Sequence, residues 1–103
     1  MNREAAFEAI ANRLLLEAGV AEGTGFGSSP GLRVGGRIFA MLAPGGLVVK
    51  LPARRCTELV AAHIGQPFDR GQGHPLTEWI VISDTEEQDW PELALEALAY
   101  VRT

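Results

Sequence analysis

The stretch from Arg33 to Leu51, RVGGRIFAMLAPGGLVVKL, constrains the fold of this chain more than any other segment. It contains three short runs of apolar and β-branched residues, and two groups of turn-forming residues separate them: Gly-Gly at 35–36 and Pro-Gly-Gly at 44–46. Apolar runs of this length between such turns are typical of β-strands. Because both turns are short, we predict a meander in which each strand runs antiparallel to the one before. The middle run, 38–42, is apolar on both alternating faces, so we expect a central strand at least partly covered on both sides.

Two segments before and after this meander have the 3.6-residue apolar periodicity of amphipathic helices. The first, residues 2–18, begins with Asn2 as a cap and ends before Gly19, which is a natural terminating residue. The second, residues 53–64, follows a proline and ends before a glycine. Its apolar face includes Cys56 and His63, so we expect both side chains to point toward the core.

The rest of the chain contains one more predicted strand and one more predicted helix. Residues 77–82, TEWIVI, are dense in β-branched and aromatic residues, which favours a strand. Residues 89–101 start with Asp89-Trp-Pro-Glu92, which has the spacing of a helix capping box. Segments rich in glycine, proline or acidic residues are expected to be loops, namely 21–31, 66–76 and 83–88.

The predicted order of elements is therefore helix, three strands, helix, strand, helix. This order is typical of an α+β domain in which helices pack against an antiparallel sheet of at least four strands. A length of 103 residues suits one domain with a single core, so we expect residues 1–103 to form one domain.

The distribution of charge suggests two alternatives for the middle of the chain. The formal net charge is −4 and the sequence pI is near 5.1, which argues against a dedicated nucleic-acid-binding domain. Residues 24–70 nevertheless carry six basic and two acidic side chains, whereas residues 71–103 carry one basic and seven acidic ones. Either the two regions neutralise each other in the fold, or the basic residues between 33 and 70 form a functional patch.

The cysteine content and the apolar segments indicate the cellular compartment in which the protein is expected. The single cysteine excludes an internal disulfide bond. No segment approaches the roughly 20 apolar residues of a membrane-spanning helix. Glu4 and Glu8 lie where a signal peptide would be basic and then apolar. We therefore expect a cytoplasmic protein.

Several short motifs between residues 26 and 101 resemble the TfoX N-terminal domain and the MmcQ/YjbR-type family. They are V-G-G-R-I-F-A, V-V-K-L-P, Q-P-F, G-H-P-L and T-E-W-I-V-I, followed by a final D-W-x-E-L helix. The residues that match the TfoX series are Arg37, Phe39, Ala40, Lys50, Leu51, Pro67 and Phe68, whereas Gly25-Phe26 replaces its Met-Phe pair. The resemblance implies a two-layer α+β domain of the secretion-chaperone-like type. It implies no shared catalytic residue, and members are described as competence regulators or predicted DNA-binding proteins.

A cluster of basic residues is the main candidate binding site. Lys50, Arg54 and Arg55 flank the start of the second predicted helix, where unpaired backbone N–H groups and the helix dipole favour anions. Arg33 and Arg37 lie on the neighbouring hairpin and would join them if they converge on the same end of the sheet. Such a cluster would bind a small anion or a nucleic-acid backbone. The alternative is that Arg54 and Arg55 are ordinary exposed residues and Lys50 pairs with Glu78 across the sheet.

Catalysis and metal binding have little support in the sequence. One cysteine and two separated histidines, His63 and His74, fall short of the four ligands of a structural zinc site. A cysteine on the core-facing side of a helix would be an inert thiol. The acidic residues of 83–88 lie in a polar loop with nothing to raise a carboxyl pKa. We therefore expect no catalytic residue, no metal and no cofactor.

These observations predict a non-enzymatic regulatory module that binds a protein partner. Self-association is expected because three short helices would leave part of the apolar sheet to be covered. The alternative is weak DNA binding through the basic patch of residues 33–70. An enzyme acting on a small anionic substrate is the third possibility, for which no nucleophile–base pair is evident.

Overall fold

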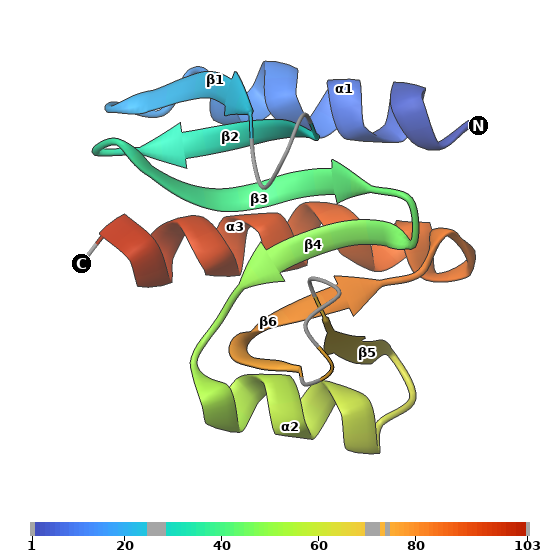
Figure 1. The fold of residues 1–103 in the computed structure, drawn as a ribbon. Helices are drawn as coiled ribbons and strands as arrows, with labels where there is room; N and C mark the ends of the chain where they lie inside the picture. The colour runs from blue at the N-terminus through green and yellow to red at the C-terminus, as the bar shows by residue number, and fades with distance from the viewer. Residues whose placement is uncertain (1, 25–28, 70–72, 74, 103) are drawn as a thin grey trace.

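The computed structural model describes residues 2–24, 29–69, 73 and 75–102. Within these residues the chain forms a six-stranded antiparallel sheet, three α-helices and a 3₁₀ helix (Figure 1). The helices are α1 (Arg3–Leu14), α2 (Ala53–Ala61), η1 (Asp84–Asp89) and α3 (Trp90–Arg102). The strands are β1 (Val20–Thr24), β2 (Pro30–Val34), β3 (Arg37–Ala43), β4 (Gly46–Lys50), β5 (Gly65–Phe68) and β6 (Leu76–Ile82).

The sheet has the strand order β1-β2-β3-β4-β6-β5, so the first four strands form a continuous meander. The predicted meander and the predicted strand at 77–82 are confirmed. Gly35 and Gly36 connect β2 to β3 and both have positive φ angles, 58° and 80°, as a type I′ hairpin turn requires. The α+β class is also confirmed, with helices packed against an antiparallel sheet.

Helices α1 and α3 lie side by side on one face of the sheet and run in the same direction (Figure 1). They cover the main hydrophobic core, whose centre includes Phe39, Leu47, Ile80, Trp90 and Leu98, all fully buried. Helix α2 instead packs at the β5–β6 end of the sheet. The exposed sides of α1 and α3 therefore form a continuous helical surface on the side of the molecule away from the sheet.

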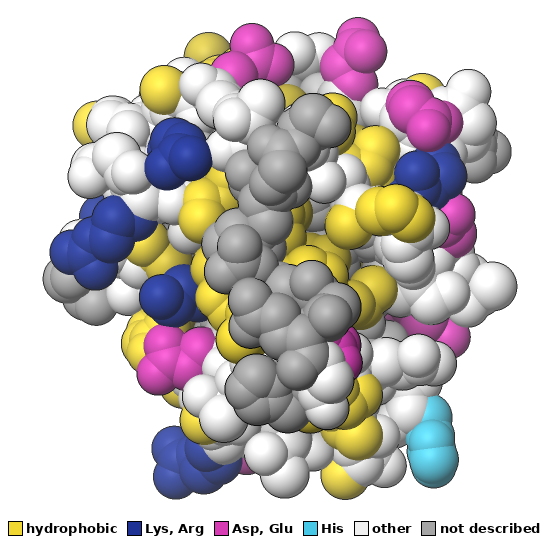
Figure 2. Space-filling view, viewed as in Figure 1, with side chains coloured by type: hydrophobic (Ala, Val, Ile, Leu, Met, Phe, Trp, Pro, Cys, Tyr) yellow, Lys and Arg dark blue, Asp and Glu magenta, His cyan; other side chains and the backbone are white. Residues whose placement is uncertain are grey.

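The opposite face of the sheet carries a second, smaller apolar cluster around Met41, Val48 and Trp79. Phe68 and Leu76 are half-buried and pack against it. Figure 2 looks onto this face and shows exposed hydrophobic side chains together with several lysine or arginine side chains. The central strands are thus apolar on both sides, as predicted from residues 38–42.

The predictions of loops at 21–31 and 66–76 are wrong in part, because β1, the start of β2 and β5 lie there. Strand β1 is at the sheet edge and mostly exposed, so it needs few apolar residues, and its sequence VAEGT gave no alternating signal. Strand β5, GQPF, is the other edge, where proline is tolerated. A Cβ at Gly65 would overlap the Ile80 side chain, which explains a glycine within a strand. Residues 25–28, 70–72 and 74 lie outside the described residues.

Helices α1 and α2 end earlier than predicted. After Leu14, tighter bonds from Leu16 to Arg13 and from Glu17 to Leu14 replace the α-helical pattern, and Gly19 then has a φ of 81°. Helix α2 ends at Ala61 because His63 adopts a φ of 62°.

The backbone N–H groups of His63 and Ile64 donate to the carbonyl oxygens of Val60 and Leu59, which is a Schellman motif. His63 is therefore exposed, and the prediction that it faces the core with Cys56 is wrong.

The start of the last helix also differs from the prediction. The segment 83–88 was expected to be a loop, but Asp84–Asp89 form the 3₁₀ helix η1, which continues directly into α3. The Ser83 side chain accepts a hydrogen bond from the Thr85 N–H and caps this unit, so Asp89 is not the cap. In the described part of the chain, no helix has the length and apolar character needed to traverse a lipid bilayer.

Candidate functional site: a groove between two helices

The structure places the five predicted basic site residues at several separate positions. Arg33 lies on β2, and its guanidinium donates to the carbonyl oxygens of Gly36 and Thr24, both at 2.9 Å. These bonds tie the β2–β3 turn to the edge strand β1. Arg33 therefore braces the hairpin with the same N–H groups that would otherwise bind an anion.

Lys50 and Arg55 are both paired with carboxylates of the chain. The Lys50 ammonium lies 4.0 Å from the Glu78 carboxylate and 5.7 Å from the centre of the Trp79 ring. The Arg55 guanidinium binds Glu96 of α3 through two nitrogens, at 2.7 and 3.3 Å, and lies 3.5 Å from Glu58. The bond to Glu96 is the main reason that the Arg55 pKa is raised. The alternative pairing of Lys50 with Glu78 is therefore confirmed.

Arg37 and Arg54 remain exposed, and neither forms an ion pair within the part of the chain that the structure describes. Arg37 and Lys50 line a small recess of about 240 Å³ together with Glu78 and Tyr100. The phenol of Tyr100 has its pKa raised by partial burial and by a hydrogen bond with Glu78. Glu78 already pairs with Lys50 and forms a hydrogen bond with Tyr100. Its negative charge therefore offsets the basic side chains, and the recess offers an anion little net positive charge.

Cys56 and the histidines form no reactive pair among the described residues. The Cys56 thiol is buried, and burial raises its pKa, so it stays protonated at neutral pH. Its sulfur lies 3.7 Å from the Leu51 carbonyl oxygen. His63 is exposed beyond the end of α2, and His74 lies outside the described residues. No group of three His, Cys, Asp or Glu side chains in the described ranges is arranged to hold a metal ion.

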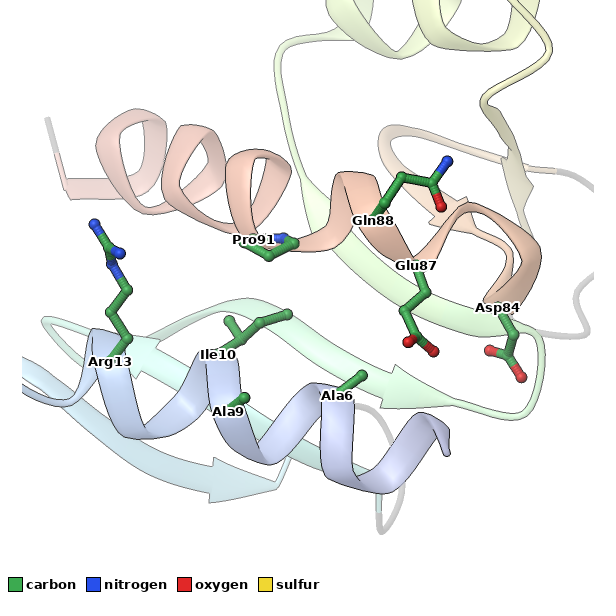
Figure 3. A pocket seen from close by; sticks show the side chains of 8 residues that line it. All are labelled: Ala6, Ala9, Ile10, Arg13, Asp84, Glu87, Gln88 and Pro91. Atoms are coloured by element: carbon green, nitrogen blue, oxygen red, sulfur yellow. The ribbon is translucent and has the colours of Figure 1, made fainter. Parts of the chain in front are cut away.

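A larger cavity lies between α1 and the start of α3. It has a volume of about 650 Å³ and is open to solvent (Figure 3). Its floor is apolar and consists of Ala6, Ala9 and Ile10 from α1, with Pro91 opposite them from α3. Ala6 and Ile10 are buried, whereas Ala9 and Pro91 are exposed. The shape is a groove with small side chains at its centre, which allow another backbone to approach closely.

The two ends of this groove carry opposite charges. Arg13 lies at one end, and Asp84 and Glu87 of η1 lie at the other (Figure 3). Positions 6 and 13 on α1 are seven residues apart, so the floor of the groove extends roughly 10 Å along this helix. Asp84 is already paired with Arg3 at 3.0 Å. Arg13 and Glu87, in contrast, form no ion pair with any described residue.

The walls of the groove are held in place by contacts at both ends of α1. At the start of α1, the Arg3 guanidinium also donates to the Ala43 carbonyl oxygen, which anchors the helix to the end of β3. At the far end, Arg102 of α3 pairs with Glu17 at 3.3 Å. These contacts fix α1 relative to η1 and α3, so the groove is a preformed feature of the fold.

Exposed apolar side chains extend the groove along α3, and another lies just beyond the end of α1. On α3, Leu95 is 38% exposed and lies one turn after Pro91 on the same side of the helix, with exposed Ala99 one turn further on. Leu16 is 86% exposed and follows the end of α1, next to the residue that pairs with α3. Together with the groove, Leu95 and Ala99 form an apolar surface that we call the helix face: Ala9, Pro91, Leu95 and Ala99, bordered by Arg13 and Glu87.

Sequence reasoning did not identify this helix face. Four α1 residues line the groove, and their spacing of three and four places them on one side of the helix, which the sequence alone already indicates. They are Ala6, Ala9, Ile10 and Arg13. Their partners on η1 and α3 lie more than 70 residues later in the chain, in a segment predicted to be an acidic loop. Only the tertiary arrangement brings the basic and acidic ends into one groove.

Comparisons with known proteins give no further guide to this site. The chain matches no protein-family model, and neither the curated proteins nor the solved structures contain a significant match.

Proposed function

We propose that this protein is a non-enzymatic interaction module that binds an α-helix of another polypeptide along its helix face. The observation that carries the proposal is the groove between α1 and α3, with its apolar floor and, at each end, a charge of opposite sign that has no ion-pair partner among the described residues. Docking of an amphipathic helix into an apolar groove is a recurrent mode of peptide recognition.

The charges of the groove define the helix that fits it. Its cationic end lies against Glu87 and Asp84, and its acidic end lies against Arg13. Helices are stabilised by acidic residues at the start and basic residues at the end, so the occupant runs antiparallel to α1. That orientation also places the dipoles of the two helices antiparallel, which is favourable. Its central residues are small or aliphatic because the groove floor consists of Ala6, Ala9 and Ile10.

Several features support this proposal over the two alternatives. Nucleic-acid binding would rely on the basic patch of residues 33–70, yet Arg33, Lys50 and Arg55 are already engaged within the chain. An enzyme would need a nucleophile with a base, and the buried, protonated Cys56 has no such partner among the described residues. The resemblance to the TfoX N-terminal and YjbR families, with a secretion-chaperone-like fold, agrees with a binding role and stays a prediction.

Fluorescence anisotropy of a labelled synthetic helix tests the proposal. The probe is a peptide of about four turns with alanine and leucine on one side, glutamate at its start and lysine at its end. We expect the wild-type protein to bind it and Ala9→Arg to bind it about tenfold more weakly or worse, because arginine at the groove centre blocks the contact. Ala9 is exposed and arginine is a good helix former, so the variant should fold.

Two matched controls make the result specific. Ala62→Arg adds the same charge at an exposed position just after α2, at the other end of the sheet, and should leave the affinity unchanged. A peptide of the same composition with its glutamate and lysine exchanged should bind more weakly than the probe. Equal binding of the probe by wild type and Ala9→Arg, or no binding by protein dilute enough to be monomeric, would contradict the proposal.

A further inference from the structure

We propose that the helix bound in the groove is α1 of a second copy of this chain. The two copies would form a dimer with two-fold symmetry, in which Arg13 of each copy faces Glu87 of the other. This inference rests on the proposed function, because it names the partner of the same surface.

The helix face is complementary to itself. In a dimer with two-fold symmetry, the same surface of both copies is in contact, so the surface must match its own half-turned image. A surface with a cation at one end, an acid at the other and an apolar centre meets this condition. Arg13 and Glu87 lie at the two ends of the groove and lack ion pairs with the described residues, and the dimer supplies both pairs at once.

Helix α1 itself has the properties required of the occupant. It carries Glu4 and Glu8 in its first half and Arg13 in its last turn. Its exposed side includes Ala5 and Ala9, which are small enough to let two helices pack closely. A half-turn about an axis near Ala9 lays the two α1 helices antiparallel and puts the Arg13 end of one beside the Glu87 end of the other.

The apolar residues around the groove provide the remaining contact area. A stable dimer buries about 800 Å² on each partner, which is more than one groove provides. Leu95 on the helix face and Leu16 just beyond the end of α1 are among the most exposed large hydrophobic side chains of the described residues. Their burial in the dimer would complete an interface with an apolar centre and a charged rim, as is typical of such contacts.

Reversal of the charge at Arg13 or at Glu87 tests the inference, with the dissociation constant of the dimer measured by sedimentation equilibrium. Wild type is expected to be dimeric, with a dissociation constant that rises in high salt because the rim pairs are screened. Arg13→Glu places two acids opposite each other at both ends of the interface, and Glu87→Arg places two cations there. Each single variant should therefore dimerise about tenfold more weakly or worse.

Mixing the two variants gives the decisive result. When the Arg13→Glu and Glu87→Arg proteins are combined, every contact between unlike copies is again a pair of opposite charges. The mixture should form a heterodimer with an affinity close to that of wild type, although each variant alone is mostly monomeric. Loss of folding cannot produce this rescue, and a mixture that stays monomeric would overturn the pairing.

A disulfide cross-link provides a second measurement that does not depend on charge. Ala9 lies near the proposed axis, so Ala9→Cys should form an intermolecular disulfide bond under mild oxidation. The native Cys56 can stay in place because its buried thiol is unreactive. Ala62→Cys, exposed just beyond α2, should cross-link far more slowly at the same concentration. Equal cross-linking of the two variants would count against the proposed axis.

The two proposals can fail separately. If wild type stays monomeric at high concentration while the synthetic helix binds in a manner sensitive to Ala9→Arg, the dimer is wrong and the helix-binding function stands. If wild type is monomeric and the peptide does not bind, both are wrong. A dimer that persists in all three variants, Arg13→Glu, Glu87→Arg and Ala9→Arg, would place the interface elsewhere and overturn the inference.

Discussion

Replacement of Gly46 by alanine is expected to lower the free energy of unfolding by about 3 kcal/mol or more. Gly46 opens β4 with a φ of 141°, a backbone conformation that side chains rarely permit. A Cβ at this position would overlap the carbonyl oxygen of Ile82 and lie 3.0 Å from its carbonyl carbon. Those are backbone atoms of the neighbouring strand β6, so relief requires the sheet itself to shift. Equilibrium unfolding in urea, monitored by circular dichroism, measures the effect.

Substitutions at two other glycines separate the two causes of this loss of stability, namely steric overlap with β6 and backbone strain. Gly45 precedes it in the same turn, and an added Cβ would have ordinary contact with the Val81 side chain at 3.4 Å, so Gly45→Ala should change stability little. Gly36 has a φ of 80° with open space around the Cβ position, so Gly36→Ala should cost only about 1 kcal/mol of conformational strain. If Gly46→Ala costs no more than Gly36→Ala, the close approach of β4 and β6 is not as described.

Replacement of Trp90 by alanine is expected to lower the free energy of unfolding by about 4 kcal/mol. This is a large part of the roughly 5–15 kcal/mol that is typical of a domain of this size. Trp90 is fully buried at the start of α3, under the sheet face that α1 and α3 cover. Its indole N–H also donates to the carbonyl oxygens of Ile82 and Ser83, at 3.0 and 3.3 Å. The residue thus fixes the start of α3 to the end of β6, which is where the acidic end of the groove is built.

The variant Trp90→Phe separates the two contributions to this loss of stability, which are the indole hydrogen bonds and the packing of the side chain. Phenylalanine fills much of the volume but leaves the two carbonyl oxygens without the indole donor, so we expect a loss of about 2 kcal/mol in urea unfolding. The difference between the two variants reports the cavity left by alanine. A loss for Trp90→Phe as large as that for Trp90→Ala would contradict a main role for packing.

The sequence predicted those elements whose own residues carry a complete signal. The meander has apolar runs and turn glycines, α1 and α3 have regular apolar stripes, and β6 has β-branched and aromatic residues. The edge strands β1 and β5 were missed because an edge strand is exposed and requires little apolar character. The early end of α2 was missed because His63 takes the left-handed position that glycine usually occupies.

The binding residues were harder to predict for a different reason. Arg55 looked like a free cation at the start of a helix, but its partner Glu96 lies 41 positions away and only the fold brings them together. The helix face depends in the same way on contacts between α1 and residues near 84–102. Local sequence describes each half of the groove and gives no indication that the halves meet.

Amide hydrogen exchange of the wild-type protein, diluted until it is monomeric and measured with and without a saturating amount of the synthetic helix, tests the helix face most directly. The helix face is predicted to gain protection in peptides that cover residues 3–17 and 84–102, with no change in 37–50 or 53–64. Protection that appears on α2 or on the outer face of the sheet instead would contradict the assignment of α1 and α3 as the binding surface.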